Sequence, residues 1–288
     1  MSKKSIQQGH APVSNAADLK KATKVKKAKT AVKNLPDQIV DLFLALVFID
    51  ELKPGDRLPP ELELTKILKV NQSSLRMAMR VLSRMKVIES TRGSGLVVLD
   101  YKLESGPNFY SELVRIPELY LGASFLLSLL DQMSNFFGLL MRSVIDDMNA
   151  KTSLGYLVSL DKQIEYLKSN RAPSEIAAID INTQGEGSLK IENPILQSMF
   201  NSFRPLRAYM MEIYYSISGN HLEHIEAQKG IWTALIEQRM TKDEYIDEYL
   251  RLLTAEFEIL RKHLEKQPPH PKLLTSPLQH YPELISLH

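Results

Sequence analysis

The sequence predicts a mainly α fold in two parts: three helices with a β-hairpin near the N-terminus, then an all-α antiparallel helical bundle. Three observations predict this fold class. Residues 58–98 show two short helical periods, a turn and a hairpin with a polar tip. Residues 109–266 show long apolar periods of helical spacing without a strand pattern. A polar segment with a Gly-Pro breaker, residues 102–108, is predicted to link the two parts.

Length and composition bound the classes of protein that this chain can be. Its 288 residues exceed one typical domain, and a hydrophobic content of 44% supports real cores. It has no run of 18 uncharged apolar residues, so we expect no membrane span. Its lysine-rich N-terminus has no adjoining apolar core, so we expect no secretory signal. Cysteine is absent, which excludes disulfides and thiolate sites and fits a cytoplasmic location.

The charges are distributed unevenly along the chain, although the net charge is only +2. Residues 1–33 carry +8, residues 35–100 carry zero and the remainder carries −6. Residues 1–33 have few large apolar groups and are predicted to be a disordered basic tail. Its lysines either add contacts to phosphates or only keep the chain soluble, and the residues leave both readings open. The asymmetry suggests that the N-terminal end faces a polyanion.

Three helices are predicted within residues 34–101. The first, 35–52, begins near Pro36 and ends at the breaker Lys53-Pro54-Gly55-Asp56. The apolar residues of the other two recur at helical spacing: Leu64, Ile67 and Leu68, then Leu75, Met79 and Leu82. Asn71 stands between these two helices, where an N-cap belongs.

Two helices joined by a short turn form a helix-turn-helix unit, whose second helix can enter the major groove of DNA. The candidate DNA-binding residues of that helix are polar and lie on its outer face or at its start: Gln72, Ser73, Ser74, Arg76 and Arg80. Small donors suit phosphates, and arginines suit guanine edges or phosphates. At the hairpin tip, Gly93 permits a close backbone approach that would carry Arg92 into a minor groove. The alternative is a packed helical hairpin with a solvated polar face.

The stretch 58–98, LPPELELTKILKVNQSSLRMAMRVLSRMKVIESTRGSGLVV, resembles the winged helix-turn-helix of GntR-type bacterial transcription regulators. The positions that match the family pattern are Leu58, Pro59, Glu61, Glu63, Leu64, Val70, Arg76, Leu82, Gly93, Gly95 and Val97. Two positions depart from it, because Leu62 and Gln72 replace arginines that contact the operator in the family. The resemblance implies DNA binding. The departures imply a different sequence preference or a lower affinity.

The second part is predicted to contain six or seven helices that form an antiparallel bundle. They are predicted at 109–121 with an interruption at Pro117, 122–148, 154–167, 173–191, 195–218, 221–239 and 242–266. The proline-rich residues 267–288 show no clear period and are predicted to be a loosely docked C-terminal tail.

This helical part is similar to that of the FadR-like subgroup of the same family. DINTQGEGSLKIENP at 180–194 and EAQKGIWTALIEQ at 226–238 carry the similarity. The resemblance implies an effector-binding and dimerisation domain at 109–266. Many relatives hold a metal there through one aspartate and three histidines. The corresponding residues here are Asp180, Gln184, Gln228 and Glu256.

The loss of three imidazoles removes ligands that transition metals prefer, so we expect no metal and no cofactor. The four polar groups can instead bind a hydroxylated or amine-bearing effector, or they are bonded to one another. An enzyme is not expected, because no catalytic constellation is found among the seven histidines. His221 and His224 share one helical face but lack a carboxylate at metal-site spacing, and they are interpreted as exposed polar residues.

The sequence is therefore interpreted as that of a cytoplasmic, homodimeric transcription regulator, a repressor. Its expected partners are a double-stranded DNA operator, a small-molecule effector and a second copy of the chain, with no membrane. Two alternatives remain. One is a largely sequence-independent DNA-binding protein, and the other is a helical interaction module without specific DNA reading.

Overall fold

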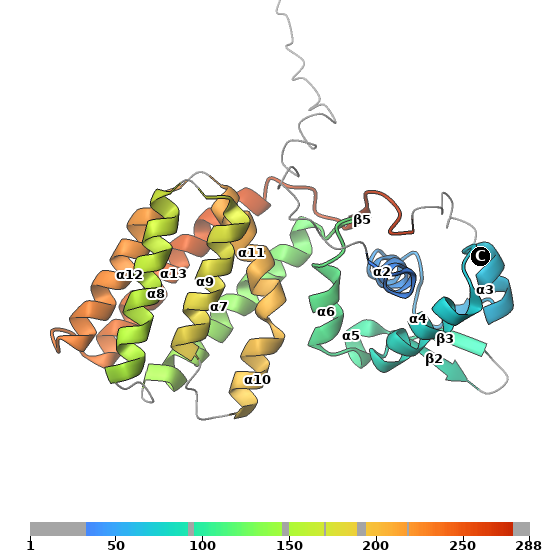
Figure 1. The fold of residues 1–288 in the computed structure, drawn as a ribbon, viewed down its shortest axis with the longest axis horizontal. Coiled ribbons are helices and arrows are strands. Elements are labelled where there is room, and N and C mark those ends of the chain that lie inside the picture. Colours follow the sequence, from blue (N-terminus) through green and yellow to red (C-terminus); the bar gives the residue numbers. More distant parts are fainter. Residues whose placement is uncertain are drawn as a thin grey trace, which may run out of the picture. The chain divides into compact units, whose positions relative to one another are not determined.

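The computed structural model describes residues 33–91, 95–145, 150–169, 171–188, 194–217 and 219–278. The predicted basic tail lies outside these residues, apart from Lys33. The described part is mainly α, and it confirms the predicted fold class of a winged helix-turn-helix followed by helices (Figure 1). The boundaries of the predicted domains stay a prediction.

The N-terminal module holds three helices and a small sheet. The helices are α2 (Leu35–Phe48), α3 (Glu61–Ile67) and α4 (Gln72–Arg84). The antiparallel sheet has the order β1-β3-β2, with β1 (Arg57–Leu58), β2 (Ile88–Thr91) and β3 (Gly95–Val98). A hairpin was predicted here, with strands at 87–88 and 96–98, and β2 extends beyond the prediction into Ser90 and Thr91, which were expected in the polar tip. Strand β1 was not expected, and it pairs Leu58 with Leu96.

Local capping explains where these helices begin. The side chain of Asn34 accepts a hydrogen bond from the Asp37 N–H at 3.0 Å at the start of α2. The predicted cap Asn71 accepts one from the Ser74 N–H at 2.8 Å at the start of α4. Helix α2 ends at Phe48 and not at the predicted residue 52, because the chain enters the left-handed region at Asp50 (φ 62°).

The segment 102–108 was predicted to be a plain linker, and the structure corrects this. It contains most of α5 (Tyr101–Glu104) and the start of α6 (Pro107–Leu113). The Ser105 hydroxyl donates to the carbonyl of Met85 at 2.8 Å, and the Tyr101 ring stacks on Phe109 at 4.4 Å. The segment is therefore packed against the end of α4, and the two aromatic residues that flank it, Tyr101 and Phe109, belong to the apolar core.

Two expectations for the C-terminal half were wrong. Strand β4 (Leu119–Tyr120) pairs with β5 (Lys272–Leu273), although no strand was expected after residue 108, and this pairing fixes the start of the predicted loose tail. The Tyr120 hydroxyl also donates to the carbonyl of Pro268 at 2.8 Å. At Gly122 (φ 82°) a Cβ atom would lie 2.6 Å from the Pro271 nitrogen, so only glycine fits beside this segment.

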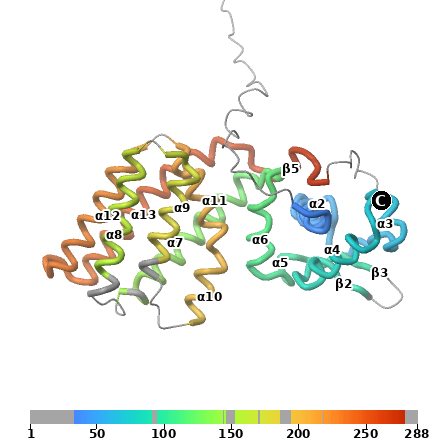
Figure 2. Tube along the Cα trace, viewed as in Figure 1, coloured from blue at the N-terminus to red at the C-terminus, as the bar shows by residue number. Residues whose placement is uncertain are grey.

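The bundle is built from the helices α7 to α13 (Figure 1). Their bounds are α7 Ala123–Ile145, α8 Ala150–Lys168, α9 Pro173–Ser188, α10 Pro194–Ser202, α11 Arg204–Ser216, α12 His221–Ile236 and α13 Lys242–Leu264. The single helix predicted at 195–218 is two helices (Figure 2), with the break at Phe203. Pro205 explains the break, since it has no N–H to continue the helical bonding.

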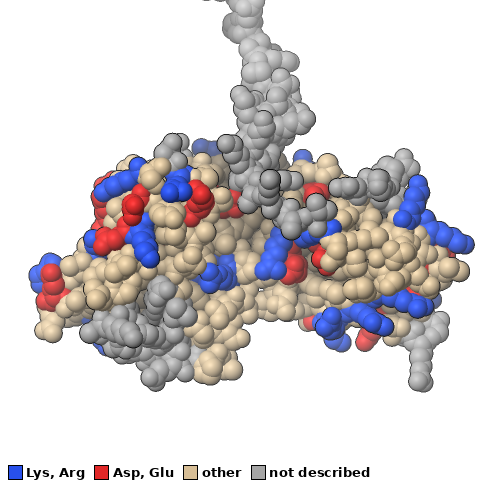
Figure 3. Space-filling model, viewed as in Figure 1, with Lys and Arg blue, Asp and Glu red and all other residues tan. Residues whose placement is uncertain are grey.

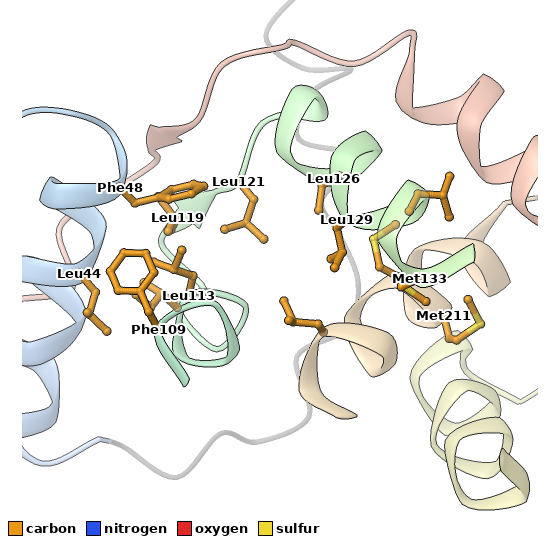
Figure 4. Close-up of a cluster of buried hydrophobic side chains, with 14 of the residues drawn as sticks. Leu44, Phe48, Phe109, Leu113, Leu119, Leu121, Leu126, Leu129, Met133 and Met211 are labelled. Carbon is orange, nitrogen blue, oxygen red and sulfur yellow. The ribbon is translucent and has the colours of Figure 1, made fainter. Parts of the chain in front are cut away.

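Helix α7 is the one described helix that is long and apolar enough, by length and composition, to cross a membrane. It packs against α13, and its Asp131 forms an ion pair with Arg261 of that helix. Its apolar residues continue the core that begins in the N-terminal module. Figure 4 shows this cluster, with labelled residues Leu44, Phe48, Phe109, Leu113, Leu119, Leu121, Leu126, Leu129, Met133 and Met211. These contacts are those of a core helix.

Candidate functional site

The candidate DNA-binding residues of α4 lie opposite its buried face. The buried face consists of Leu75, Ala78, Met79 and Leu82. Gln72, Ser73, Arg76 and Arg80 are exposed, whereas Ser74 is half-buried beside the cap. The Arg76 Nε donates to Glu61 Oε2 of α3 at 2.8 Å, in an ion pair on the surface. The start of α4 is thus open to solvent and carries hydrogen-bond donors, which suits a phosphate backbone.

Two large apolar residues lie on the surface of the same helix pair. Leu62 of α3 is 64% exposed and Met77 of α4 is 53% exposed. The sequence analysis treated Leu62 as a departure from the family pattern and did not single out Met77. Helical spacing could have found Met77, because it follows Ser73 by four residues and precedes Arg80 by three.

The predicted wing contacts cannot be placed. Arg92 and Gly93 lie outside the described residues, so their role stays a prediction. The strands beside them are described, and Glu89 and Ser90 on β2 are exposed. On the face seen in Figure 3, acidic and basic side chains are interspersed over larger uncharged areas.

The four candidate effector residues meet at one cavity inside the bundle. Asp180 and Gln184 come from α9, Gln228 from α12 and Glu256 from α13. The other lining residues are Phe137, Met211, His224, Ile225, Tyr249, Leu252, Leu253 and Phe257. The free volume is about 20 Å³, which is room for about one water molecule. The cavity is therefore nearly filled by its own side chains.

Asp180 is the centre of a buried hydrogen-bond network. Its Oδ1 accepts from Gln184 Nε2 at 3.1 Å, and its Oδ2 accepts from the Tyr215 hydroxyl at 3.1 Å. The Tyr215 hydroxyl in turn accepts from Gln163 Nε2 at 2.8 Å. Burial, and then the nearby charge of Glu256, raise the pKa of Asp180 to about 7. Its carboxyl group therefore changes its protonation state near neutral pH.

Arg207 of α11 is a buried positive charge that contacts this network through Gln184. It is 1% exposed, and its Nη1 donates to Gln184 Oε1 at 2.7 Å. Its guanidinium lies 3.6 Å from the centroid of the Phe200 ring. Burial lowers the pKa of Arg207 to about 10, while the charge of Asp180 opposes that change. Arg207 was not predicted from the sequence, because it shares its helix face with apolar residues and belongs to no recognisable spacing.

His224 corrects the interpretation of the two histidines as exposed residues. Its Nε2 lies 2.9 Å from Glu256 Oε2, and its side chain is only 13% exposed. Burial alone would lower the pKa of His224, but the hydrogen bond to Glu256 and the charges of Glu256 and Asp180 raise it. His221 is also partly buried, with its Nε2 2.7 Å from the carbonyl of Ile217. The helix face that both share therefore points into the bundle.

The remaining member, Gln228, donates from Nε2 to the Tyr156 hydroxyl at 2.7 Å. Each of the four candidate effector residues thus has a hydrogen-bond or ion-pair partner within the bundle. Among the described residues, no three His, Cys, Asp or Glu side chains are grouped so that they could hold a metal ion. What the cavity offers a ligand is carboxylate, amide and hydroxyl groups beside aromatic rings.

Comparison with known proteins places residues 35–98 in the family of bacterial regulatory proteins named gntR. The matched residues contain α2, β1, α3, α4 and the hairpin. A curated relative, the HTH-type transcriptional regulator Rv0494 of Mycobacterium tuberculosis, is 41% identical over 93 residues. That match covers 32% of this chain and 35% of the relative, so the chain spans about a third of the relative's length.

Solved structures with a similar fold include McbR/YncC of E. coli, Lar of Listeria monocytogenes and a GntR family member of Pseudomonas syringae. Their identities to this chain are 16%, 15% and 15%, and their TM-scores are 0.41, 0.48 and 0.39. They cover 80%, 82% and 88% of this chain, and 99%, 99% and 100% of their own chains.

Proposed function

We propose that this chain, which belongs to the GntR family of bacterial regulatory proteins through residues 35–98, regulates transcription by binding operator DNA. The observation that carries the proposal is the exposed polar face of α4. A helix of this kind enters the major groove with its N-terminal residues against the bases and backbone. Gln72, Ser73 and Ser74 are assigned to the backbone, and Arg76 and Arg80 to base edges or phosphates.

We also propose that the cavity between α9, α12 and α13 binds a small effector with hydroxyl or amine groups. Asp180, Gln184, Gln228 and Glu256 are assigned to it, and His224 joins them because it is paired with Glu256. Since the free volume is about 20 Å³, an effector must displace side chains from their present partners. Such a change can alter DNA affinity only if the effector binds one arrangement of the protein better than the other.

The finer features of the proposal follow from the family and not from the described geometry. We propose a homodimer that represses transcription in the cytoplasm and has no catalytic activity. Two protomers would read an inverted repeat, since the symmetry of a dimer is mirrored in its operator. The wing residues Arg92 and Gly93 are assigned to the minor groove beside each recognition helix.

The test is selection of duplexes bound by the full chain from a random pool. We expect a short inverted repeat. We expect Arg76→Ala and Arg80→Ala each to weaken binding to the selected duplex by about 5- to 100-fold, the loss of one good contact. The control is Arg239→Ala, which removes an exposed arginine at the end of α12 and should leave the affinity unchanged.

The outcomes also separate the two alternative functions. Binding with a steep salt dependence but no selected motif would favour the sequence-independent DNA-binding protein. Absence of binding to any duplex would favour the interaction module. For the effector, hydroxylated and amine-bearing compounds are screened for release of the selected duplex. A response that Gln228→Leu and Glu256→Gln both retain would contradict the assignment of the cavity.

A further inference from the structure

Two exposed apolar side chains stand out on the helix pair that carries the proposed DNA contacts. Leu62 is 64% exposed and Met77 is 53% exposed, and they are the only large apolar residues so exposed among the described residues of 33–100. Other apolar residues of α3 and α4 are buried, with Leu64 and Leu75 at 0%. An apolar side chain gains free energy when a partner covers it, so these two side chains can contribute to binding on the surface that is assigned to DNA.

The positions of both residues direct them to the surface assigned to the major groove. Met77 lies on the same side of α4 as Ser73 and Arg80, four residues after one and three before the other. Arg76, next to Met77, is ion-paired at 2.8 Å with Glu61, which is next to Leu62. That ion pair brings the two helix positions together across the turn. Met77 and Leu62 are therefore the chain neighbours of the two members of this ion pair, one on each helix.

The major groove presents one apolar group to a protein, the C5 methyl of thymine. Guanine, adenine and cytosine present only donors and acceptors at the corresponding edges, and these would be desolvated without compensation by a leucine or methionine. The unbranched Met77 side chain can adapt its shape to a methyl group in the groove. A protein partner for the same surface would compete with the DNA that this face is proposed to bind.

We propose that Met77 and Leu62 recognise thymine methyl groups, so that each operator half-site contains thymines opposite α4 and the start of α3. This inference rests on the proposed DNA-binding function and deepens it, because it names the base feature that these two residues read. The polar residues then set the position on the backbone, and the apolar pair selects thymine over the other bases.

The test removes only the methyl groups. In the duplex selected by the full chain, each thymine is replaced in turn by deoxyuridine, which pairs identically but lacks the C5 methyl. Affinities are measured at one fixed salt concentration. We expect one or two positions in each half-site to lose about fourfold in affinity, which corresponds to the roughly 0.8 kcal/mol of one buried methylene-sized group.

The variants Met77→Ala and Leu62→Ala assign the effect to residues. Each is expected to bind the thymine and deoxyuridine duplexes equally at the position it reads, as a double-mutant cycle requires for a direct contact. The control is Leu103→Ala on α5, which removes a leucine that is 82% exposed and lies outside the helix pair. This variant should keep the fourfold ratio between the affinities for the thymine and the deoxyuridine duplexes. All three residues are exposed, so their variants should fold, and circular dichroism checks this.

Each outcome decides the inference. Wild-type binding that is indifferent to deoxyuridine at every position would overturn it while leaving the proposed DNA binding intact. A fourfold effect that both alanine variants retain would also overturn it, because other residues would then read the methyl groups. Failure to bind any duplex would overturn the proposed function, and this inference with it.

Discussion

The charged residues of the two candidate sites differ in their exposure to solvent. In the N-terminal module, Arg76 lies on the surface with its side chain 56% exposed and pairs with Glu61, whose side chain is 39% exposed. In the bundle, Arg207 is 1% exposed and is held by Gln184 and the Phe200 ring. On a surface that binds a large partner, water forms hydrogen bonds with the polar groups as long as no partner is bound. A site for a small ligand inside a core has to satisfy its own polar groups when it is empty.

This difference implies that the two sites respond differently to substitution. A change on α4 should alter binding and leave the free energy of unfolding nearly unchanged, since exposed ion pairs contribute little. A change around the cavity should alter the free energy of unfolding, since one lost partner leaves another buried group unpaired. Three predictions test this contrast, in order of decreasing expected effect.

The largest effect is expected for Arg207→Met. The substitution keeps much of the side-chain volume but removes the buried positive charge near Asp180 and the donor to Gln184. We expect the free energy of unfolding to fall by about 2–6 kcal/mol, because Gln184 Oε1 and the carbonyl of Phe200 both lose a buried donor and each unpaired buried group costs about 1–3 kcal/mol. Urea denaturation measures it.

Arg204→Met is the matched control, because Arg204 is exposed and donates only to Asn182 at 2.7 Å. Its loss should cost less than about 1 kcal/mol. Equal losses for the two variants would show that burial does not distinguish these arginines.

The second prediction concerns pH. The pKa of Asp180 is raised to about 7 in the folded protein from an ordinary value of 3.8, so the folded state retains a proton that the unfolded state releases. The free energy of unfolding should therefore fall as the pH rises from about 4 to 7. The pKa of His224 is also raised in the folded protein, so the folded state keeps a proton above pH 6.5 that the unfolded state has released. The free energy of unfolding should therefore continue to decrease above pH 6.5.

In Asp180→Asn, the free energy of unfolding should decrease less as the pH rises, by at most about 4 kcal/mol, since the amide cannot ionise. The difference between the variant and the wild type should be smallest at pH 4, where the folded states of both carry a neutral side chain at position 180, and largest at pH 8. Asp41, whose pKa burial raises to about 6, contributes equally to both proteins. Denaturation curves with a constant difference from pH 4 to pH 8 would contradict the assignment to Asp180.

The smallest effect on stability is expected for Glu61→Gln. It breaks the exposed ion pair with Arg76, which should change the free energy of unfolding by less than about 1 kcal/mol. It should strengthen binding to the selected duplex about two- to fivefold, because a negative charge near the phosphates is removed and Arg76 is released. Glu258→Gln, which breaks an exposed pair with Lys262 in α13, is the control and should leave DNA affinity unchanged. A weaker complex with Glu61→Gln would indicate that the pair positions Arg76 for DNA.

Much of the N-terminal module could be predicted because its signals are local. Asn71 caps α4 where the sequence indicated, and the hairpin lies where it was predicted, although β2 is longer than expected. The pairing of β4 with β5 could not be predicted in the same way. Leu119 pairs with Leu273 across more than 150 residues, and a strand of two residues is too short to show a period. The break at Phe203 did have a local signal in Pro205 that the periodicity of residues 195–218 obscured.

The residues of the candidate cavity were also predicted only in part. The positions of Asp180, Gln184, Gln228 and Glu256 came from resemblance to a family and not from their spacing, and the structure brings them to one cavity. Arg207 and His224 were not included. Their partners, Gln184 and Glu256, lie on other helices, so no pattern within one helix could connect them.

By itself, the sequence determined where most helices begin and end and which face of each is apolar, because capping and periodicity act within a few residues of chain. It also determined that α4 would present arginines on a polar face. Only the tertiary structure decided which polar residues of α9, α11, α12 and α13 meet, and how little space they leave. The reason is physical: a helical period specifies a face, whereas the partner of that face depends on how separate helices pack.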